Sequence, residues 1–122
     1  MAAIHHLVGS APVPLVVDGD GLSALGAQVG DVVARRDGDP ATVLTPHDGE
    51  FARLAGDPPG PDRIAAARRL AGAVGAIVLL KGPTTTVAHP DGRVRLNVAA
   101  DARLATAGTG DVLSGVIGSL LA

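Results

Sequence analysis

The sequence predicts an α/β protein with a mostly parallel sheet, on the evidence of an alternating pattern and of the chain length. Short apolar runs rich in β-branched residues alternate with Ala-, Leu- and Arg-rich stretches of helical period, as in parallel strands joined by helices. The 122 residues make one domain at most, and they are few for a complete doubly wound sheet. Neither an internal repeat nor a linker divides the sequence.

The first predicted unit is a strand, a turn and a short helix. Pro14–Asp18 is apolar up to its last residue, which predicts a buried strand. Gly19–Gly21 supplies the turn, and Leu22–Ala27 is predicted to form the helix. The polar stretch Asp31–Pro40 that follows is expected to be a loop.

The second unit repeats this order with longer helices. Ala41–Thr45 is the second predicted strand, and Pro46 opens a helix over His47–Leu54. After a Pro- and Gly-rich loop, Gly56–Pro61, an amphipathic helix over Asp62–Val74 crosses to the next strand. Its apolar stripe consists of Ile64, Ala67, Leu70, Ala71 and Val74, with Arg63, Arg68 and Arg69 off the stripe.

The last third of the chain holds a strand, a hairpin and a final helix. Ala76–Lys81 is the third predicted buried strand. Thr85–Ala88 and Arg93–Asn97, separated by a turn containing Asp91-Gly92, are typical of a β-hairpin. An apolar helix is expected to follow Gly110 and to close the chain.

The start of that closing helix is a candidate phosphate site. Gly108, Thr109 and Gly110 form a turn that the free N–H groups of the helix face, which makes an anion hole. Asp111, in the first helical turn, could take a proton from a hydroxyl that attacks a phosphoryl group held there. The alternative is an ordinary helix start, with Thr109 as the N-cap and Asp111 favouring the helix dipole.

Rare residues mark the carboxyl ends of the predicted strands, where ligands bind in open α/β sheets. The chain has one lysine, Lys81, and one glutamate, Glu50. Lys81 precedes a run of glycine and hydroxyl residues that suits a phosphate or a ribose, although a lysine at a strand end is often only solvated. Glu50 and His47 open a helix, where both residue types also occur without a function. Asp18 and Asp20 either satisfy turn amides or serve Mg²⁺ or substrate.

Composition excludes several classes of protein. The net charge of −2 and a single aromatic residue offer no platform for nucleic acid. No apolar run reaches the length of a membrane span, and His5 and His6 interrupt the N-terminal apolar stretch, which argues against a secretory signal. The absence of cysteine is compatible with a reducing compartment, so we expect a soluble, cytoplasmic protein. His5, His6 and His89 are interpreted as surface residues.

Five ordered motifs resemble those of the ADP-dependent (S)-NAD(P)H-hydrate dehydratases, which belong to the ribokinase-like superfamily. The segments that carry the resemblance are Val17–Leu22, Leu44–Leu54, Leu79–Thr85, Asp91–Arg93 and Leu104–Gly115. They occur in family order across nearly the whole chain. The resemblance implies a ribokinase-like fold of three layers, with helices on both faces of the sheet.

The resemblance also implies an activity and site residues. The enzyme would dehydrate the S form of hydrated NADH or NADPH to the working cofactor, converting ADP to AMP and phosphate with Mg²⁺. His47 and Asp111 would contact the hydrated nicotinamide, with Asp111 as the base. The residues that would line the nucleotide site are Lys81, Gly82, Pro83, Thr84, Thr85 and Gly110. Glu50 and Asp20 are candidates for Mg²⁺ contacts through water. A homo-oligomer is allowed, and functional pairing with an NAD(P)H-hydrate epimerase is implied.

The chain also departs from the family pattern. Asp48 stands where the family usually has Pro and adds charge beside the expected substrate, Ser23 replaces an Asn, and Ala100–Arg103 replaces an Asn-Pro-Gly type of loop. Residues 1–122 resemble only the middle and late parts of the family domain, without its first strands and last helices, so we expect a partial domain with a bare sheet edge.

Two other functions remain open from the sequence. A small-molecule kinase of the same superfamily would use the same anion hole and base, although such kinases generally lack the segment Thr45–Phe51 as it stands here. A non-catalytic remnant that associates with an intact partner is the other.

Overall fold

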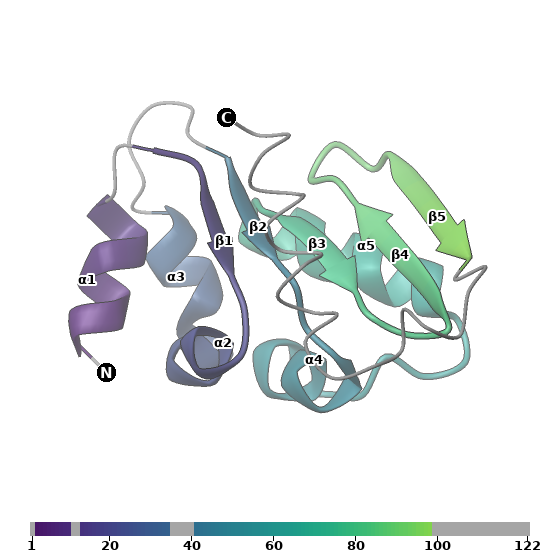
Figure 1. Cartoon of the computed structure of the whole chain (residues 1–122), viewed down its shortest axis with the longest axis horizontal. Helices are drawn as coiled ribbons and strands as arrows, with labels where there is room; N and C mark the ends of the chain where they lie inside the picture. Colours follow the sequence, from purple (N-terminus) through teal and green to yellow (C-terminus); the bar gives the residue numbers. More distant parts are fainter. Residues whose placement is uncertain (1, 11–12, 35–40, 99–122) are drawn as a thin grey trace.

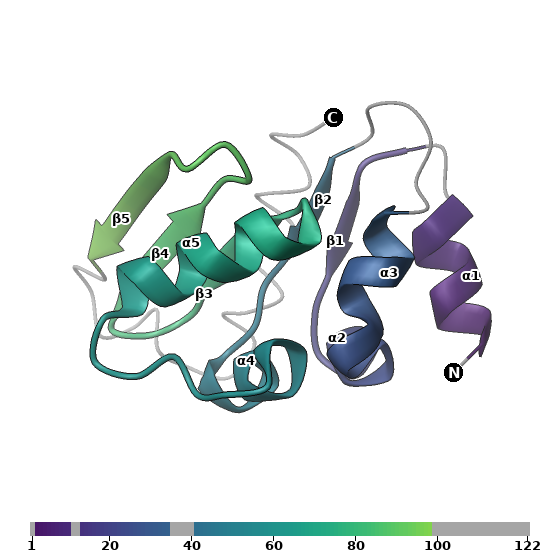
Figure 2. The same ribbon diagram turned by 180° about the vertical axis from the view of Figure 1, so that it is seen from behind.

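The computed structural model describes residues 2–10, 13–34 and 41–98, which form a five-stranded sheet with its helices on one face and at one end (Figures 1 and 2). The strands stand side by side in chain order. They are β1 (Leu15–Val17), β2 (Thr42–Leu44), β3 (Ile77–Leu80), β4 (Thr84–Ala88) and β5 (Val94–Val98). All lie within or close to the predicted ranges.

The sheet combines a parallel half with an antiparallel hairpin. β1 pairs with β2 and β2 with β3 in parallel, with Val17 opposite Leu44 and Leu44 opposite Val78. β4 is antiparallel to both β3 and β5, so four of the five strands run in the same direction. The predicted α/β class with a mostly parallel sheet is therefore confirmed, and β1 and β5 are the outer strands of the described sheet.

Two helical segments differ from prediction. α2 (Asp20–Leu25) continues through the 3₁₀ turn η1 (Gly26–Gln28) into α3 (Val29–Ala34), so the loop predicted from Asp31 was wrong for residues 31–34; residues 35–40 lie outside the described part. The helix forms because Val29, Val32 and Val33, at helical spacing, bury one face. α1 (Ala2–Ser10) was not predicted. The ring of His5 on α1, interpreted as a surface residue, is half-buried, with Nε2 2.7 Å from the carbonyl of Ala24.

The other two helices confirm the predictions and end alike. α4 spans Asp48–Ala55 and α5 spans Arg63–Val74. Each is followed by a glycine with a positive φ, Gly56 at 90° and Gly75 at 71°, a left-handed cap that other residues adopt at a cost. Within the described residues no helix has the length and apolar character needed to cross a membrane.

The core lies between the sheet and the helices that face the viewer in Figure 2. Leu44, Val78 and Leu80 project from the strands toward Leu22 and Phe51 of the helices, and all five are buried. The buried α5 residues are mostly alanines, which let that helix lie close to the sheet. The helix predicted after Gly110 lies outside the described residues.

Candidate functional site

The carboxyl ends of β1, β2 and β3 come together at the lower end of the sheet in Figure 1, where α2 and α4 begin. Backbone hydrogen bonds extend the ladder past the strands. The Thr45 N–H donates to the Val17 carbonyl over 3.1 Å, and the Lys81 N–H donates to the Pro46 carbonyl over 2.9 Å. The strand-end segments predicted to carry the site are therefore adjacent and held in register.

Lys81 and Asp18 form an ion pair across this edge. The Nζ atom lies 3.0 Å from Oδ1 of Asp18, and the two side chains are 25% and 24% exposed. Since β2 stands between β1 and β3, the pair spans the end of the middle strand. The structure thus gives Asp18 a lysine partner, which neither sequence interpretation of this residue included.

The surroundings of Asp18 favour its charged form. Burial is the largest influence on its pKa and raises it. Hydrogen bonds from Lys81, Thr45 and the Gly19 backbone, with the charge of Lys81, outweigh burial and lower the pKa below its ordinary value. The Gly19 contact means that Asp18 also satisfies a turn amide, as one sequence interpretation held.

His47 and Glu50 form a capping box at the start of α4. The His47 N–H donates to Oε1 of Glu50 over 3.1 Å, and the Glu50 N–H donates to Nδ1 of His47 over 3.1 Å. Because Nδ1 accepts, the proton of the neutral ring belongs on Nε2, which lies 3.5 Å from the same carboxylate. Glu50 is 6% exposed, whereas the His47 side chain is 59% exposed. The carboxylate of Glu50 is therefore engaged in the cap, while the ring of His47 is open to a ligand.

Arg63, the first residue of α5, reaches the same edge. Its Nη1 donates to Oδ1 of Asp48 over 2.7 Å, and its Nη2 donates to the carbonyl of Lys81 over 2.8 Å. Asp48, which was expected to add charge beside the substrate, is paired with Arg63. Sequence reasoning placed Arg63 only off the apolar stripe. The available signal was a cation in the first helical turn, where the helix dipole disfavours it.

The remaining candidate residues lie either near this edge of the sheet or outside the described residues. Gly82 and Pro83 follow Lys81 and are exposed, and Thr84 and Thr85 begin β4 directly after them. Asp20 is exposed in the first turn of α2. Gly108, Thr109, Gly110 and Asp111 lie outside the described residues. Among the described residues no three His, Cys, Asp or Glu side chains gather to hold a metal ion.

A cavity of about 380 Å³ opens elsewhere, between η1, α3, α4 and α5. Phe51, Leu54, Leu70 and Val74 provide much of its apolar lining, with Arg69 among the polar residues. None of the predicted site residues lines it. The chemistry-bearing residues therefore belong to the sheet edge and not to this cavity.

A mostly parallel sheet with ionisable residues at the carboxyl ends of its parallel strands is typical of the ribokinase-like proteins. The chain is similar to a ribokinase-like superfamily protein from Enterococcus faecalis, with 30% identity and a TM-score of 0.68, over 88% of this chain and 37% of that one. The model of the NAD(P)H-hydrate dehydratase family matches residues 1–122, so the chain belongs to that family.

Relatives with curated names and a solved structure agree. A bifunctional NAD(P)H-hydrate repair enzyme Nnr from Mycobacterium tuberculosis is 61% identical over 109 residues, 89% of this chain and 22% of the relative. An ADP-dependent (S)-NAD(P)H-hydrate dehydratase from Neisseria meningitidis is 46% identical over 89% of this chain and 38% of the relative. A Bacillus subtilis ADP/ATP-dependent NAD(P)H-hydrate dehydratase, co-crystallised with ATP/Mg²⁺, is 34% identical with a TM-score of 0.75, over 98% of this chain and 41% of that one. The chain thus spans between a fifth and two fifths of the length of these relatives.

Proposed function

We propose that the protein carrying this chain dehydrates the S form of hydrated NADH or NADPH, converting ADP to AMP and phosphate. The observation that carries the proposal is the ion pair at the edge of the sheet, where Nζ of Lys81 lies 3.0 Å from Oδ1 of Asp18. The pair belongs to a chain whose whole length matches the dehydratase family. A cation held beside a loop of glycine and hydroxyl residues suits the phosphates of a nucleotide.

The nucleotide site would be formed by Lys81–Thr85 together with Gly110. Support comes from the Neisseria relative, which is named as ADP-dependent, and from the Bacillus structure, which was co-crystallised with ATP/Mg²⁺. Mg²⁺ would neutralise the phosphate charges. Glu50, whose carboxylate is engaged in the α4 cap, and the exposed Asp20 would be candidates for contacts to the ion through water. The described residues thus suit a metal that arrives with the nucleotide.

The hydrated nicotinamide would contact His47 and Asp111. The Nε2–H of His47, on a side chain that is 59% exposed, can donate a hydrogen bond to the substrate. Asp111 would take the proton of the ring hydroxyl while the hydroxyl oxygen attacks the β-phosphorus of ADP and AMP leaves. The amides of Gly108–Gly110 would stabilise the phosphoryl group during the transfer. Phosphate is a better leaving group than hydroxide, so elimination assisted by the ring nitrogen would then restore the dihydronicotinamide.

A thermal melt with and without Mg²⁺-ADP is the first test, because a ligand that binds only the folded state raises the midpoint. An upward shift, followed by recovery of nicotinamide absorbance and release of AMP from hydrated NADH, would support the proposal. A stable phosphorylated product would instead identify a small-molecule kinase of the superfamily. A chain that binds no nucleotide and associates in a concentration-dependent way would be a non-catalytic remnant.

Asp111→Asn tests the base. The variant should lose turnover by about 100-fold or more, because an amide does not accept the hydroxyl proton, while ADP affinity stays largely unchanged. Comparable turnover in the variant and the unmodified protein would sink the assignment.

The proposal extends to the setting of the reaction. The Mycobacterium relative is named as a bifunctional repair enzyme, so we expect an epimerase activity to supply the S form of the substrate. We also propose a cytoplasmic location for the reaction. A homo-oligomer is compatible with it and is checked by the mass of the protein in solution.

A further inference from the structure

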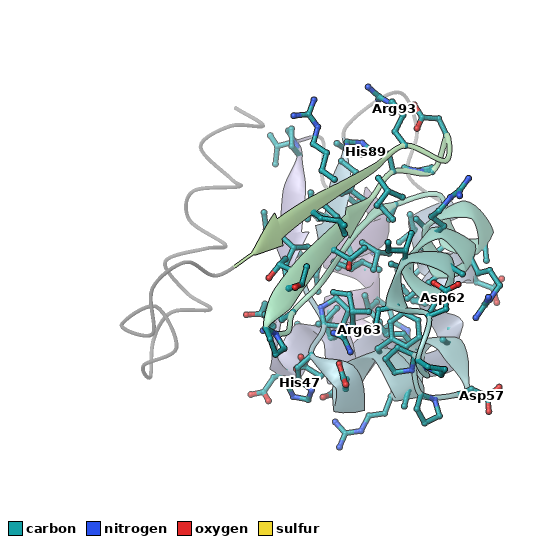
Figure 3. All side chains as sticks on the ribbon, turned by 90° about the vertical axis from the view of Figure 1, so that its right-hand side faces the viewer. His47, Asp57, Asp62, Arg63, His89 and Arg93 are labelled. Atoms are coloured by element: carbon teal, nitrogen blue, oxygen red, sulfur yellow. The ribbon has the colours of Figure 1, made fainter. Side chains whose placement is uncertain are left out.

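The guanidinium of Arg63 joins three elements at the edge of the sheet. From the first turn of α5 it contacts Asp48, in the first turn of α4, and the main chain at the end of β3. Figure 3 labels Arg63 in the lower part of the molecule, in the same region as His47. Its side chain is 27% exposed, less than half the 61% exposure of Asp48.

The position of Arg63 is unfavourable for its own helix. A cation in the first turn lies against the positive end of the helix dipole. In addition, its buried Nε has no hydrogen-bond partner among the described residues. Residues that violate the preferences of their own helix are found most often at functional sites. The contacts of Arg63 with other elements therefore account best for its position.

Hydrogen bonds hold the main chain of Lys81 on both sides, one at each of its two peptide groups. The Lys81 N–H donates to Pro46, and the Lys81 carbonyl accepts from Arg63 over 2.8 Å. Gly82 lies so close that a Cβ there would stand 2.7 Å from Nη2 of Arg63. A side chain at residue 82 would therefore require the Arg63 guanidinium to shift.

We infer that Arg63, anchored by Asp48, is a positioning residue that orients the Lys81–Gly82 peptide and with it the loop that receives the nucleotide. The inference rests on the proposed function, because only the proposed nucleotide site assigns a ligand to that loop. Arg63 itself does not touch the nucleotide. It acts by ordering the loop before binding, so its loss weakens binding without altering the chemical step.

Two measurements on the same variants test this inference. In Arg63→Ala, the amides of Gly82 and of residues 84–86 should exchange hydrogen faster, while those of β1 and β2 keep their protection. The Kd for Mg²⁺-ADP should rise by about tenfold, as for loss of one charge-assisted hydrogen bond. Arg63→Lys, which keeps the charge but not the two-sided geometry, should lie between, and it replaces the alanine variant if that one does not fold. Asp48→Ala should raise the Kd by about twofold to threefold, since its pair is exposed.

Arg53→Ala is the matched control. Arg53 also links two helices, through a 3.3 Å hydrogen bond from Nη1 to the Ser23 hydroxyl, whereas the side chains that bond to Lys81 within the described residues are those of Arg63 and Asp18. Its Kd for ADP and its loop exchange should stay at the unmodified values. An equal rise in Kd for Arg53→Ala and Arg63→Ala would contradict a positioning role.

A double-mutant cycle with Asp48→Ala separates positioning from general damage. Asp48 anchors the Arg63 guanidinium over 2.7 Å, so adding Asp48→Ala to Arg63→Ala should cause no further loss of ADP binding. Additive losses would overturn the coupling. Unchanged ADP binding in Arg63→Ala would overturn this inference alone, whereas failure of the unmodified protein to bind ADP would overturn the proposed nucleotide site as well.

Discussion

Two aspartate ion pairs at different places in the sheet show how little distance alone says about such a contact. Asp91 and Arg93, in the turn of the β4–β5 hairpin, approach to 2.7 Å, whereas Asp18 and Lys81 are 3.0 Å apart. In the shorter pair the side chain of Arg93 is 72% exposed and that of Asp91 is 54% exposed, and the two residues are two positions apart in the sequence. The longer pair is three-quarters buried and joins strands that are not neighbours.

Burial and topology therefore rank these pairs in the opposite order to their distances. Water and salt screen the hairpin pair, and its geometry can form locally in an unfolded chain. The Asp18–Lys81 pair exists only when β1 and β3 have assembled on either side of β2. Only the second pair can couple the fold to the site, and three experiments can break or sharpen this contrast.

Replacement of the two cations should give the largest difference. Lys81→Met removes the charge proposed for the phosphates and leaves Asp18 partly buried without its partner. We expect at least a tenfold rise in the Kd for Mg²⁺-ADP and a loss of about 1–3 kcal/mol in the free energy of unfolding. Titration calorimetry and denaturant melts measure the two effects.

Arg93→Met is the control for that variant. Both the Kd and the free energy of unfolding should stay at the unmodified values, because solvent screens the attraction between Asp91 and Arg93. Equal losses in the two variants would show that burial does not distinguish the pairs.

The same contrast should hold for the two helix caps. The Glu50 carboxylate accepts from His47 over 3.1 Å inside the protein, and exposed Asp62 accepts from Ala65 over 3.0 Å. Glu50→Ala strands a half-buried N–H and should cost about 1–2 kcal/mol, against about 0.5–1 kcal/mol for Asp62→Ala. Thermal or denaturant unfolding of both variants measures the difference, and an equal cost would contradict the role given to burial.

The elements of this fold were largely predictable because their signals are local. Strand runs, the His47 and Asp62 helix starts and the Asp91-Gly92 turn are written in neighbouring residues. α1 was missed because its nine residues carry neither an acidic first turn nor a basic last turn. α3 was missed because the charge of Asp31 was given more weight than the apolar spacing of Val29, Val32 and Val33.

The residues gathered at the strand ends were predictable, apart from Arg63, but their pairings were not. The rarity of Lys81 and Glu50 and the order of the strands brought attention to one edge of the sheet. Which carboxylate meets Lys81 depends on strand order, since Asp18 reaches it past β2. The Arg63 contact depends on how two helices approach β3, which no local pattern encodes.

The smallest effect should appear in the acid limb of stability. The pKa values of Asp18 and Asp91 are both lowered in the folded protein, Asp18 because the Lys81 and other hydrogen bonds outweigh burial, and Asp91 chiefly because the Arg93 N–H donates to it. A lowered folded pKa adds stability that is complete above the unfolded value of about 3.9 and is lost as the pH falls through the folded pKa.

That loss requires a difference between the folded and unfolded states. The turn contact of Asp91 can persist in the unfolded chain, whereas the Lys81 contact of Asp18 cannot. Asp18→Asn should therefore flatten the fall in stability below about pH 5 by up to about 1 kcal/mol, while Asp91→Asn should leave its slope unchanged. Denaturant melts between pH 3 and 7 measure both slopes, with NMR titration of each carboxylate as the control. A flattened slope in Asp91→Asn would mean that the hairpin turn, too, is formed only in the folded state.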